Sequence, residues 1–193
     1  EVYGTALNDK VLMSEEHPCK PTTVYGASKL AGELYARAIH NLYGMPTIII
    51  RPFNTYGPRE NFRGIRGEVI PRFTNFVLSN KPPVIFGDGT QTRDFTYVDD
   101  IVDGIVKAAE NDSMIGEIVN LAFGKEVSIL QIANIIINKL DKQNKIIPEH
   151  IDSRPGDVMR HNADISKARG MLRFEPKISI ELGISMYLDW IRS

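Results

Sequence analysis

The stretch TTVYGASKLAGELYARAIHNLYGMPTIII, residues 22–50, decides the fold class of this chain. Its first part, residues 22–43, is rich in Ala and Leu and predicts a helix, which Gly44 and Pro46 end. The apolar stripe of that helix consists of Tyr25, Leu30, Leu34, Ala38 and Leu42. The run at residues 47–50 is short, apolar and β-branched, as is typical of a strand buried on both faces of a parallel sheet. A helix followed by such a strand is half of a βαβ unit, so the predicted fold class is α/β.

The same patterns continue to the end of the chain, without repeats. Further helices are expected at residues 69–78, from Asp99 or Asp100 to Ala109, from Ser128 to Leu140, from Asp164 to Leu172 and at 180–191. Strands or extended pieces are expected at residues 83–86, 97–98, 118–121 and 146–147. Residues 51–67 have no periodicity and are rich in Arg, Gly, Asn and Pro, which predicts a long functional loop.

Composition excludes several classes of protein. The 193 residues carry 23 Lys plus Arg and 24 Asp plus Glu, a net charge of -1, which gives no support to binding of nucleic acid or of an acidic membrane. Apolar runs are too short to span a bilayer. Cys19, the single cysteine, indicates a reducing compartment, so we expect a cytoplasmic protein. The four His residues lack ligand spacing, so no metal site is predicted.

Tyr25 and Lys29 are the first candidates for chemistry. Four residues apart, they share one face of the predicted helix, where the ammonium is close enough to act on the phenol. A nearby cation favours the phenolate, so the pair suits general acid/base catalysis. Taken alone, the motif is equally compatible with an amphipathic helix that carries both residues.

Other motifs stand in a fixed order around this pair. They are Val2-Tyr3-Gly4, Gly32-Glu33, Arg51-Pro52-Phe53-Asn54, Tyr56-Gly57-Pro58-Arg59, the run GDGTQTRDF at residues 87–95, Tyr97-Val98-Asp99-Asp100, Arg154-Pro155-Gly156-Asp157 and Ala163-Asp164. In this order and spacing the chain resembles the extended short-chain dehydrogenase/reductases, specifically the NAD-dependent sugar-nucleotide epimerase/dehydratase family. The resemblance extends from Glu1 to about Trp190.

The resemblance also implies a missing part. Members of the family begin with a Rossmann half whose glycine-rich loop holds the NAD pyrophosphate, and no such motif is found here. We therefore expect a C-terminal fragment: the end of a Rossmann-type parallel sheet plus a smaller α/β substrate-binding lobe. Residues 1–62 would belong to the NAD-binding domain and residues 63–193 mainly to the substrate lobe, with the two interleaved. The fragment alone is expected to be inactive.

The resemblance implies roles for individual residues. Tyr25 would be the acid/base at the sugar 4-hydroxyl, and Lys29 would bind the nicotinamide ribose and lower the pKa of Tyr25. Pro52 and Phe53 would lie against the nicotinamide end of NAD. The substrate would be contacted by Asn54, Glu68, Val69, Phe86, Arg93, Arg154, Asp157 and His161.

Some of these assignments have open alternatives. Phe86 would stack on the nucleobase, but it equally suits a core position at a strand end. Arg93 and Arg154 are interpreted as ligands of a diphosphate, the alternative being ion pairs with Asp94 or Asp157. Asp157 would accept hydrogen bonds from ribose hydroxyls or orient Arg154.

Within the family, the motifs at residues 51–59 and 87–95 resemble most those of the UDP-glucose 4-epimerases. The expected reaction is NAD-dependent 4-epimerisation of a UDP-hexose through a 4-keto intermediate, with a preference for plain hexoses because His161 is of middle size. A 4,6-dehydratase remains open because Glu1 occupies the position of the dehydratase Glu, and a UDP-glucuronate decarboxylase remains open too. A non-catalytic nucleotide sensor or scaffold is the alternative of another class. The helix at residues 22–43 is expected to form a homodimer.

Overall fold

A computed structural model of the chain describes residues 1–8, 11–60, 68–154 and 157–193. Within these ranges the helices are α1 (Val24–Tyr43), α2 (Val69–Leu78), α3 (Val98–Ala109), the short 3-10 helix η1 (Asp112–Met114), α4 (Ile129–Lys139), α5 (Ser166–Leu172) and α6 (Ile180–Arg192). The strands are β1 (Ile49–Pro52), β2 (Thr55–Tyr56), β3 (Val84–Phe86), β4 (Thr92–Asp94), β5 (Thr96–Tyr97), β6 (Ile118–Leu121), β7 (Glu126–Ser128) and β8 (Glu149–Ile151).

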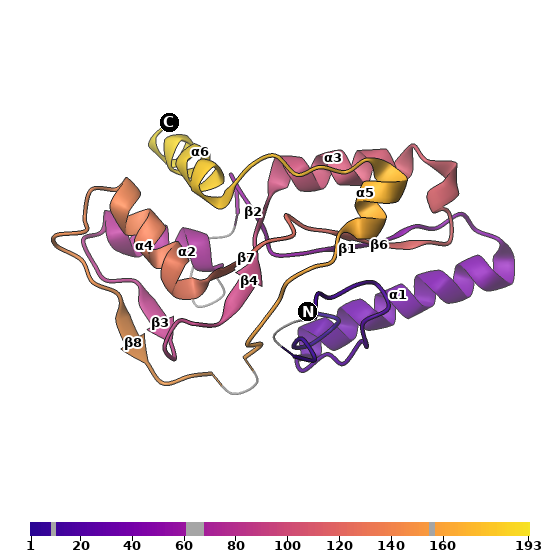
Figure 1. Cartoon of the computed structure of the whole chain (residues 1–193), viewed down its shortest axis with the longest axis horizontal. Helices are drawn as coiled ribbons and strands as arrows, with labels where there is room; N and C mark the ends of the chain where they lie inside the picture. The colour runs from indigo at the N-terminus through magenta and orange to yellow at the C-terminus, as the bar shows by residue number, and fades with distance from the viewer. Residues whose placement is uncertain (9–10, 61–67, 155–156) are drawn as a thin grey trace.

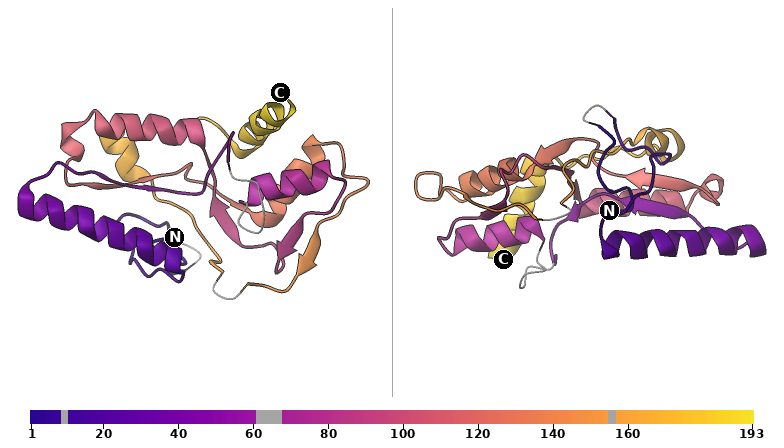
Figure 2. Two further views of the ribbon diagram at one scale, coloured as in Figure 1. Left: turned by 180° about the vertical axis from the view of Figure 1, so that it is seen from behind. Right: turned by 90° about the horizontal axis from the view of Figure 1, so that it is seen from below.

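The elements gather in two lobes (Figure 1). In one lobe β1 pairs in parallel with β6, so that Ile49 lies opposite Ile118. Helices α3 and α5 lie on one side of this pair and α1 on the other, as both Figure 1 and Figure 2 show. The other lobe contains α2, α4, the parallel pair β3–β8 and the antiparallel pair β4–β7. The two lobes are interleaved in sequence. The chain leaves the β1 lobe for α2, β3 and β4 of the second lobe and later returns to the β1 lobe with β6 and α5.

Each lobe has its own hydrophobic core. In the β1 lobe Val119 and Leu121 of β6 pack with Ile101 of α3 and with Phe174, all of them buried. Gly104 of α3 allows this approach, because a Cβ there would lie 2.7 Å from a methyl group of Leu121. The larger core of the second lobe is built from α2, α4 and α6 around residues such as Phe73, Ile132 and Tyr187.

Helix α1 forms as its sequence predicts, but its apolar side chains are left outside the core. The Thr23 hydroxyl accepts a hydrogen bond from Gly26 N at the N-terminus, and Gly44 ends the helix in the left-handed conformation with φ of 65°. Leu34 and Leu42 of the expected apolar stripe are 54% and 74% exposed. The stripe is therefore not buried against any described part of this chain.

Several local expectations are wrong. Asp164 does not cap α5 (Ser166–Leu172), whose N-cap is Ile165 without a side-chain cap bond. The strand expected at residues 146–147 is instead β8, three residues later, because Ile146 is buried in the core while Ile147 is 81% exposed. Neither Asp99 nor Asp100 caps α3, whose N-cap is Tyr97 without a side-chain bond. Asp100 instead accepts hydrogen bonds from Lys177 N and Ile178 N, both at 3.0 Å, and so holds the segment that leads into α6.

The sequence also missed the short polar strands β2, β4 and β7, and the expected strand at residues 47–50 begins and ends two residues later, as β1. None of the helices in the described ranges has the length and apolar character needed to cross a membrane.

Candidate active site

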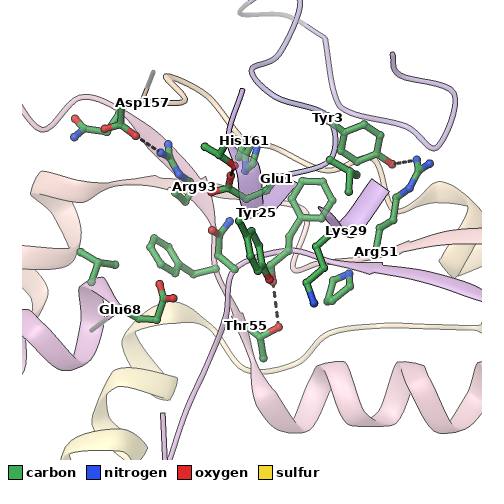
Figure 3. Close-up of a pocket in the computed structure, with 18 of the residues that line it drawn as sticks. Glu1, Tyr3, Tyr25, Lys29, Arg51, Thr55, Glu68, Arg93, Asp157 and His161 are labelled. Carbon is green, nitrogen blue, oxygen red and sulfur yellow. Dashed lines mark hydrogen bonds and ion pairs between the residues drawn. The ribbon is translucent and has the colours of Figure 1, made fainter. Parts of the chain in front are cut away.

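A cavity of about 1120 Å³ lies where the two lobes meet, and residues of both lobes line it. Every residue to which the resemblance assigned a role is among the lining residues: Tyr25, Lys29, Pro52, Phe53, Asn54, Glu68, Val69, Phe86, Arg93, Arg154, Asp157 and His161. Figure 3 labels Tyr25, Lys29, Glu68, Arg93, Asp157 and His161. These residues come from α1, the end of β1, α2, β3, β4 and the segment between β8 and α5. The fold thus brings together side chains that are up to 136 positions apart in the sequence, Tyr25 and His161 being the outermost.

Tyr25 and Lys29 lie one turn apart on α1, and the ammonium of Lys29 is 5.3 Å from the centroid of the Tyr25 ring. Tyr25 is 60% exposed and borders the cavity, so its hydroxyl is accessible to a ligand. Lys29 has no carboxylate within 4.0 Å among the residues that the structure describes. Its charge is therefore available to a ligand or to the phenol.

Pro52, Phe53 and Asn54 lie at the carboxyl end of the parallel strand β1, the edge at which α/β sheets bind their ligands. Phe53 is buried, with its ring 6.0 Å from that of Tyr3 and 5.8 Å from that of His161. The Asn54 amide donates a hydrogen bond to the carbonyl oxygen of Asp94 at 3.1 Å, which ties the end of β1 to β4.

Arg93 is paired within the protein. Its Nη2 donates to Oδ1 of Asp157 at 2.8 Å, and its Nη1 donates to the carbonyl oxygen of Val158 (Figure 3). This is the ion-pair alternative that the sequence left open for Arg93, and it means that the Asp157 carboxylate holds Arg93. Both partners of this ion pair still line the cavity.

Arg154 lies over the ring of Phe86, with its guanidinium carbon 3.7 Å from the ring centroid. The cation covers the face that was expected to receive a nucleobase, a cation–π contact that also keeps Arg154 at the cavity wall. Arg72 of α2 lines the cavity as well, and the sequence did not single it out. Burial, followed by the nearby charge of Arg154, lowers the pKa of Arg72. Arg72, Arg93 and Arg154 thus all line the cavity, with the charge of Arg93 balanced by its ion pair with Asp157.

His161 is 4% exposed and one of its ring nitrogens, Nε2, is 2.8 Å from the carbonyl oxygen of Gly4. Burial lowers the pKa of His161 from 6.5 to about 4, so the ring is neutral at neutral pH and donates its proton to that carbonyl. Glu1 borders the same part of the cavity, and its Oε2 accepts a hydrogen bond from Thr23 at 2.7 Å. Glu68 precedes α2 without capping it by its side chain.

Residues 155–156 of the Arg154–Asp157 motif, and the boundary expected between residues 62 and 63, lie outside the described ranges. The described ranges contain no group of three or more His, Cys, Asp or Glu residues that could hold a metal ion.

Residues 1–122 match the family model of the NAD dependent epimerase/dehydratase family. The chain belongs to this family. The resemblance inferred from the motifs is thereby confirmed, and with it the α/β fold class and, at the level of the family, the dependence on NAD.

Two curated relatives are similar over most of the chain. A putative UDP-glucose 4-epimerase of Methanocaldococcus jannaschii is 37% identical over 192 residues, which is 100% of this chain and 60% of the relative. A UDP-glucuronate 4-epimerase of Thermodesulfobacterium geofontis is 40% identical over 171 residues, 88% of this chain and 50% of the relative. The chain thus spans between half and three fifths of the length of these family members.

A solved structure is also similar to this chain. The UDP-glucuronic acid 4-epimerase of Bacillus cereus, in complex with UDP-glucuronic acid and NAD, superposes with a TM-score of 0.90 at 35% identity. The match covers 99% of this chain and 58% of that chain.

Proposed function

We propose that the full-length protein is an NAD-dependent 4-epimerase of a UDP-hexose of the UDP-glucose/UDP-galactose type. The observation that carries the proposal is the cavity itself, which has the Tyr25–Lys29 pair and the guanidinium groups of Arg72, Arg93 and Arg154 on its walls. Two curated epimerases among the relatives support the reaction class.

Tyr25 is the proposed acid/base. Its exposed phenol takes the proton of the sugar 4-hydroxyl and returns it when the new configuration forms. Lys29 supplies a cation one turn away, with its ammonium 5.3 Å from the centroid of the Tyr25 ring. Tyr25, Lys29, Pro52 and Phe53 border one cavity and fit the nicotinamide end of NAD. The chemistry that NAD would supply at this site is reversible hydride acceptance from C4 of the sugar, with the hydride returned to the opposite face.

The cavity wall that carries these arginines is the proposed diphosphate site. Arg72, Arg93 and Arg154 offer planar N–H donors that match phosphate oxygens in pairs. Phe86 lies under Arg154 and offers its ring to the uracil once the guanidinium turns to the phosphates. Asn54, Glu68, Val69 and Asp157 complete the proposed substrate contacts.

The full-length protein incubated with separate UDP-sugars tests the proposal. We expect interconversion of UDP-glucose and UDP-galactose, read by chromatography of the nucleotide sugars, with UDP-N-acetylglucosamine turned over more slowly because the buried His161 narrows the sugar pocket. Turnover of UDP-glucuronate alone would move the substrate to the class of the relative from T. geofontis. A 4-keto-6-deoxy product, loss of CO2 or tight binding without turnover would identify a dehydratase, a decarboxylase or a sensor, respectively, and would refute the epimerase.

A matched pair of variants tests the catalytic group. Tyr25→Phe is expected to lower kcat by about 100-fold to 10,000-fold, the usual contribution of a general acid/base. Tyr35→Phe is the control, because Tyr35 is an exposed tyrosine of the same helix that does not line the cavity. Equal activity of the two variants would remove Tyr25 from the mechanism.

We also propose that α1 forms a two-fold dimer. Its exposed apolar side chains include Leu34 and Leu42, which nothing in the described chain covers. Sedimentation equilibrium of the full-length protein is expected to give a dimer, and Leu34→Lys is expected to shift it toward monomer. A wild-type monomer would refute this proposal.

A further inference from the structure

Helix α1, which carries Tyr25 and Lys29, is attached to the rest of the chain at few points. Of its 20 residues only Gly26 and Glu33 are buried. Gly26 packs against the backbone of Glu1, where a Cβ would lie 2.8 Å from the carbonyl oxygen. Gly26 and Glu33 flank Lys29, one turn before it and one turn after it, so these two contacts fix how α1 is rotated about its own axis.

The second of these contacts is a buried ion pair with two parallel bonds. Arg51 of β1 donates from Nη2 to Glu33 Oε1 at 2.6 Å and from Nε to Glu33 Oε2 at 2.9 Å. The two side chains are only 7% and 5% exposed. Two parallel bonds between a planar guanidinium and a carboxylate fix the orientation of the carboxylate as well as its distance.

Arg51 is itself held in place. Its Nη1 donates to the hydroxyl of Tyr3 at 2.6 Å (Figure 3) and to the carbonyl oxygen of Glu15 at 3.0 Å. The Tyr3 hydroxyl in turn donates to Asn120 of β6 at 2.7 Å. Tyr3, Glu33 and Arg51 all line the cavity together with Tyr25 and Lys29. The network therefore connects the catalytic helix to both strands of the β1–β6 pair.

A buried ion pair is a poor way to gain stability, because its desolvation offsets most of the Coulombic gain and apolar residues of similar volume are often as good. It does, however, fix an orientation, since even a small rotation of α1 about its axis would break both hydrogen bonds between Arg51 and Glu33. From this geometry we propose that Glu33 and Arg51 are positioning residues: they set the rotation of α1 and so place the Tyr25 hydroxyl and the Lys29 ammonium at the cavity. The expected effect of this ion pair on kcat rests on the proposed function.

The test uses the full-length protein with Glu33 and Arg51 both changed to Met, which removes the pair without leaving a buried charge. We expect a resistance to urea close to that of the wild type and a kcat about 10-fold to 100-fold lower, as for a displacement of about 1 Å in a catalytic group. The KM for the UDP-sugar is expected to stay within about threefold, because the cationic residues Arg93 and Arg154 lie on other elements. The control is the pair Glu117→Met and Lys167→Met, an ion pair of 2.8 Å in the same lobe that does not line the cavity; its kcat is expected to stay unchanged.

A double variant that is stable and keeps the wild-type kcat would overturn the assignment and leave the ion pair a structural role only. If the double variant does not fold, Arg51→Lys serves instead, since it keeps the charge and loses the second parallel bond; a kcat close to wild type would overturn the assignment there too. A crystal structure of the double variant provides a test that does not depend on activity. Compared with the wild type, we expect the Tyr25 hydroxyl to be displaced relative to Phe53, and a hydroxyl in the same position would contradict the proposal. If the wild type itself turns over no UDP-sugar, the proposed function fails while the structural arm still decides the role of the ion pair.

Discussion

His161 is expected to make the stability of this protein fall steeply in mild acid. The ring is 4% exposed, and burial lowers its pKa from 6.5 to about 4. The folded protein therefore keeps His161 neutral where the unfolded chain binds a proton, so the unfolded state binds more protons between these two values. Stability conferred by the neutral ring is fully present above pH 6.5 and is lost as the pH falls toward about 4.

The magnitude follows from the two pKa values. At about pH 5 the difference in proton binding costs about 2 kcal/mol of unfolding free energy, and below about pH 4 the cost levels off at about 3 kcal/mol. Urea unfolding of the wild type and of His161→Gln, compared at about pH 7.5 and about pH 5, measures this cost. Gln keeps an N–H donor for the carbonyl oxygen of Gly4 and does not titrate.

The control for this prediction is His150→Gln, which replaces an exposed histidine. It is expected to keep the pH dependence of the wild type. Between about pH 7.5 and about pH 5, the unfolding free energy of His161→Gln is expected to fall by about 2 kcal/mol less than that of the wild type. If the wild type and His161→Gln lose the same free energy between the two pH values, burial does not hold His161 neutral and the reasoning fails.

Two further predictions concern stability. Gly104→Val is expected to destabilise the β1 lobe by about 1–3 kcal/mol in urea unfolding, because the new Cβ would lie 2.7 Å from Leu121 and 3.0 Å from Phe174. An unchanged urea midpoint would show that the core rearranges around the added side chain without a cost in stability. Asp100→Asn replaces one of the two oxygens that accept from Lys177 N and Ile178 N with an amide N–H₂ donor, and is expected to cost about 1–3 kcal/mol; full retention of stability would mean that these bonds add nothing net.

Local sequence patterns were sufficient where a signal is contained in a few neighbouring residues. Helix α2 has the predicted bounds, Val69–Leu78, and Ser128 caps α4 with Gln131 three residues later in a reciprocal capping box. The strand at Ile118–Leu121 is also as predicted, because Ile118, Val119 and Leu121 make a short, mostly apolar segment that is typical of a buried strand. The candidate site residues, too, were found from motifs whose order is visible in the chain, and they line one cavity.

The missed features depend on residues far apart in the sequence. The polar strand Thr92–Asp94 exists because Glu126–Ser128 pairs with it, and no local pattern announces either strand. Likewise, the sequence left open whether Arg93 pairs with Asp157, and only the tertiary structure decided it, since the two residues are 64 positions apart.

The sequence by itself determined the α/β class, most helices and the identity of the family, because periodicity, capping residues and motif order are properties of the linear chain. Tertiary structure alone decided which charged groups meet: Arg51 with Glu33, Arg93 with Asp157, and Arg154 over Phe86. It also decided which apolar residues are core, since Val119 is buried while Leu42 of the helix stripe is exposed. The reason is physical: a hydrogen bond or a buried contact depends on the distance between two groups in space, and that distance is set by the packing of whole elements.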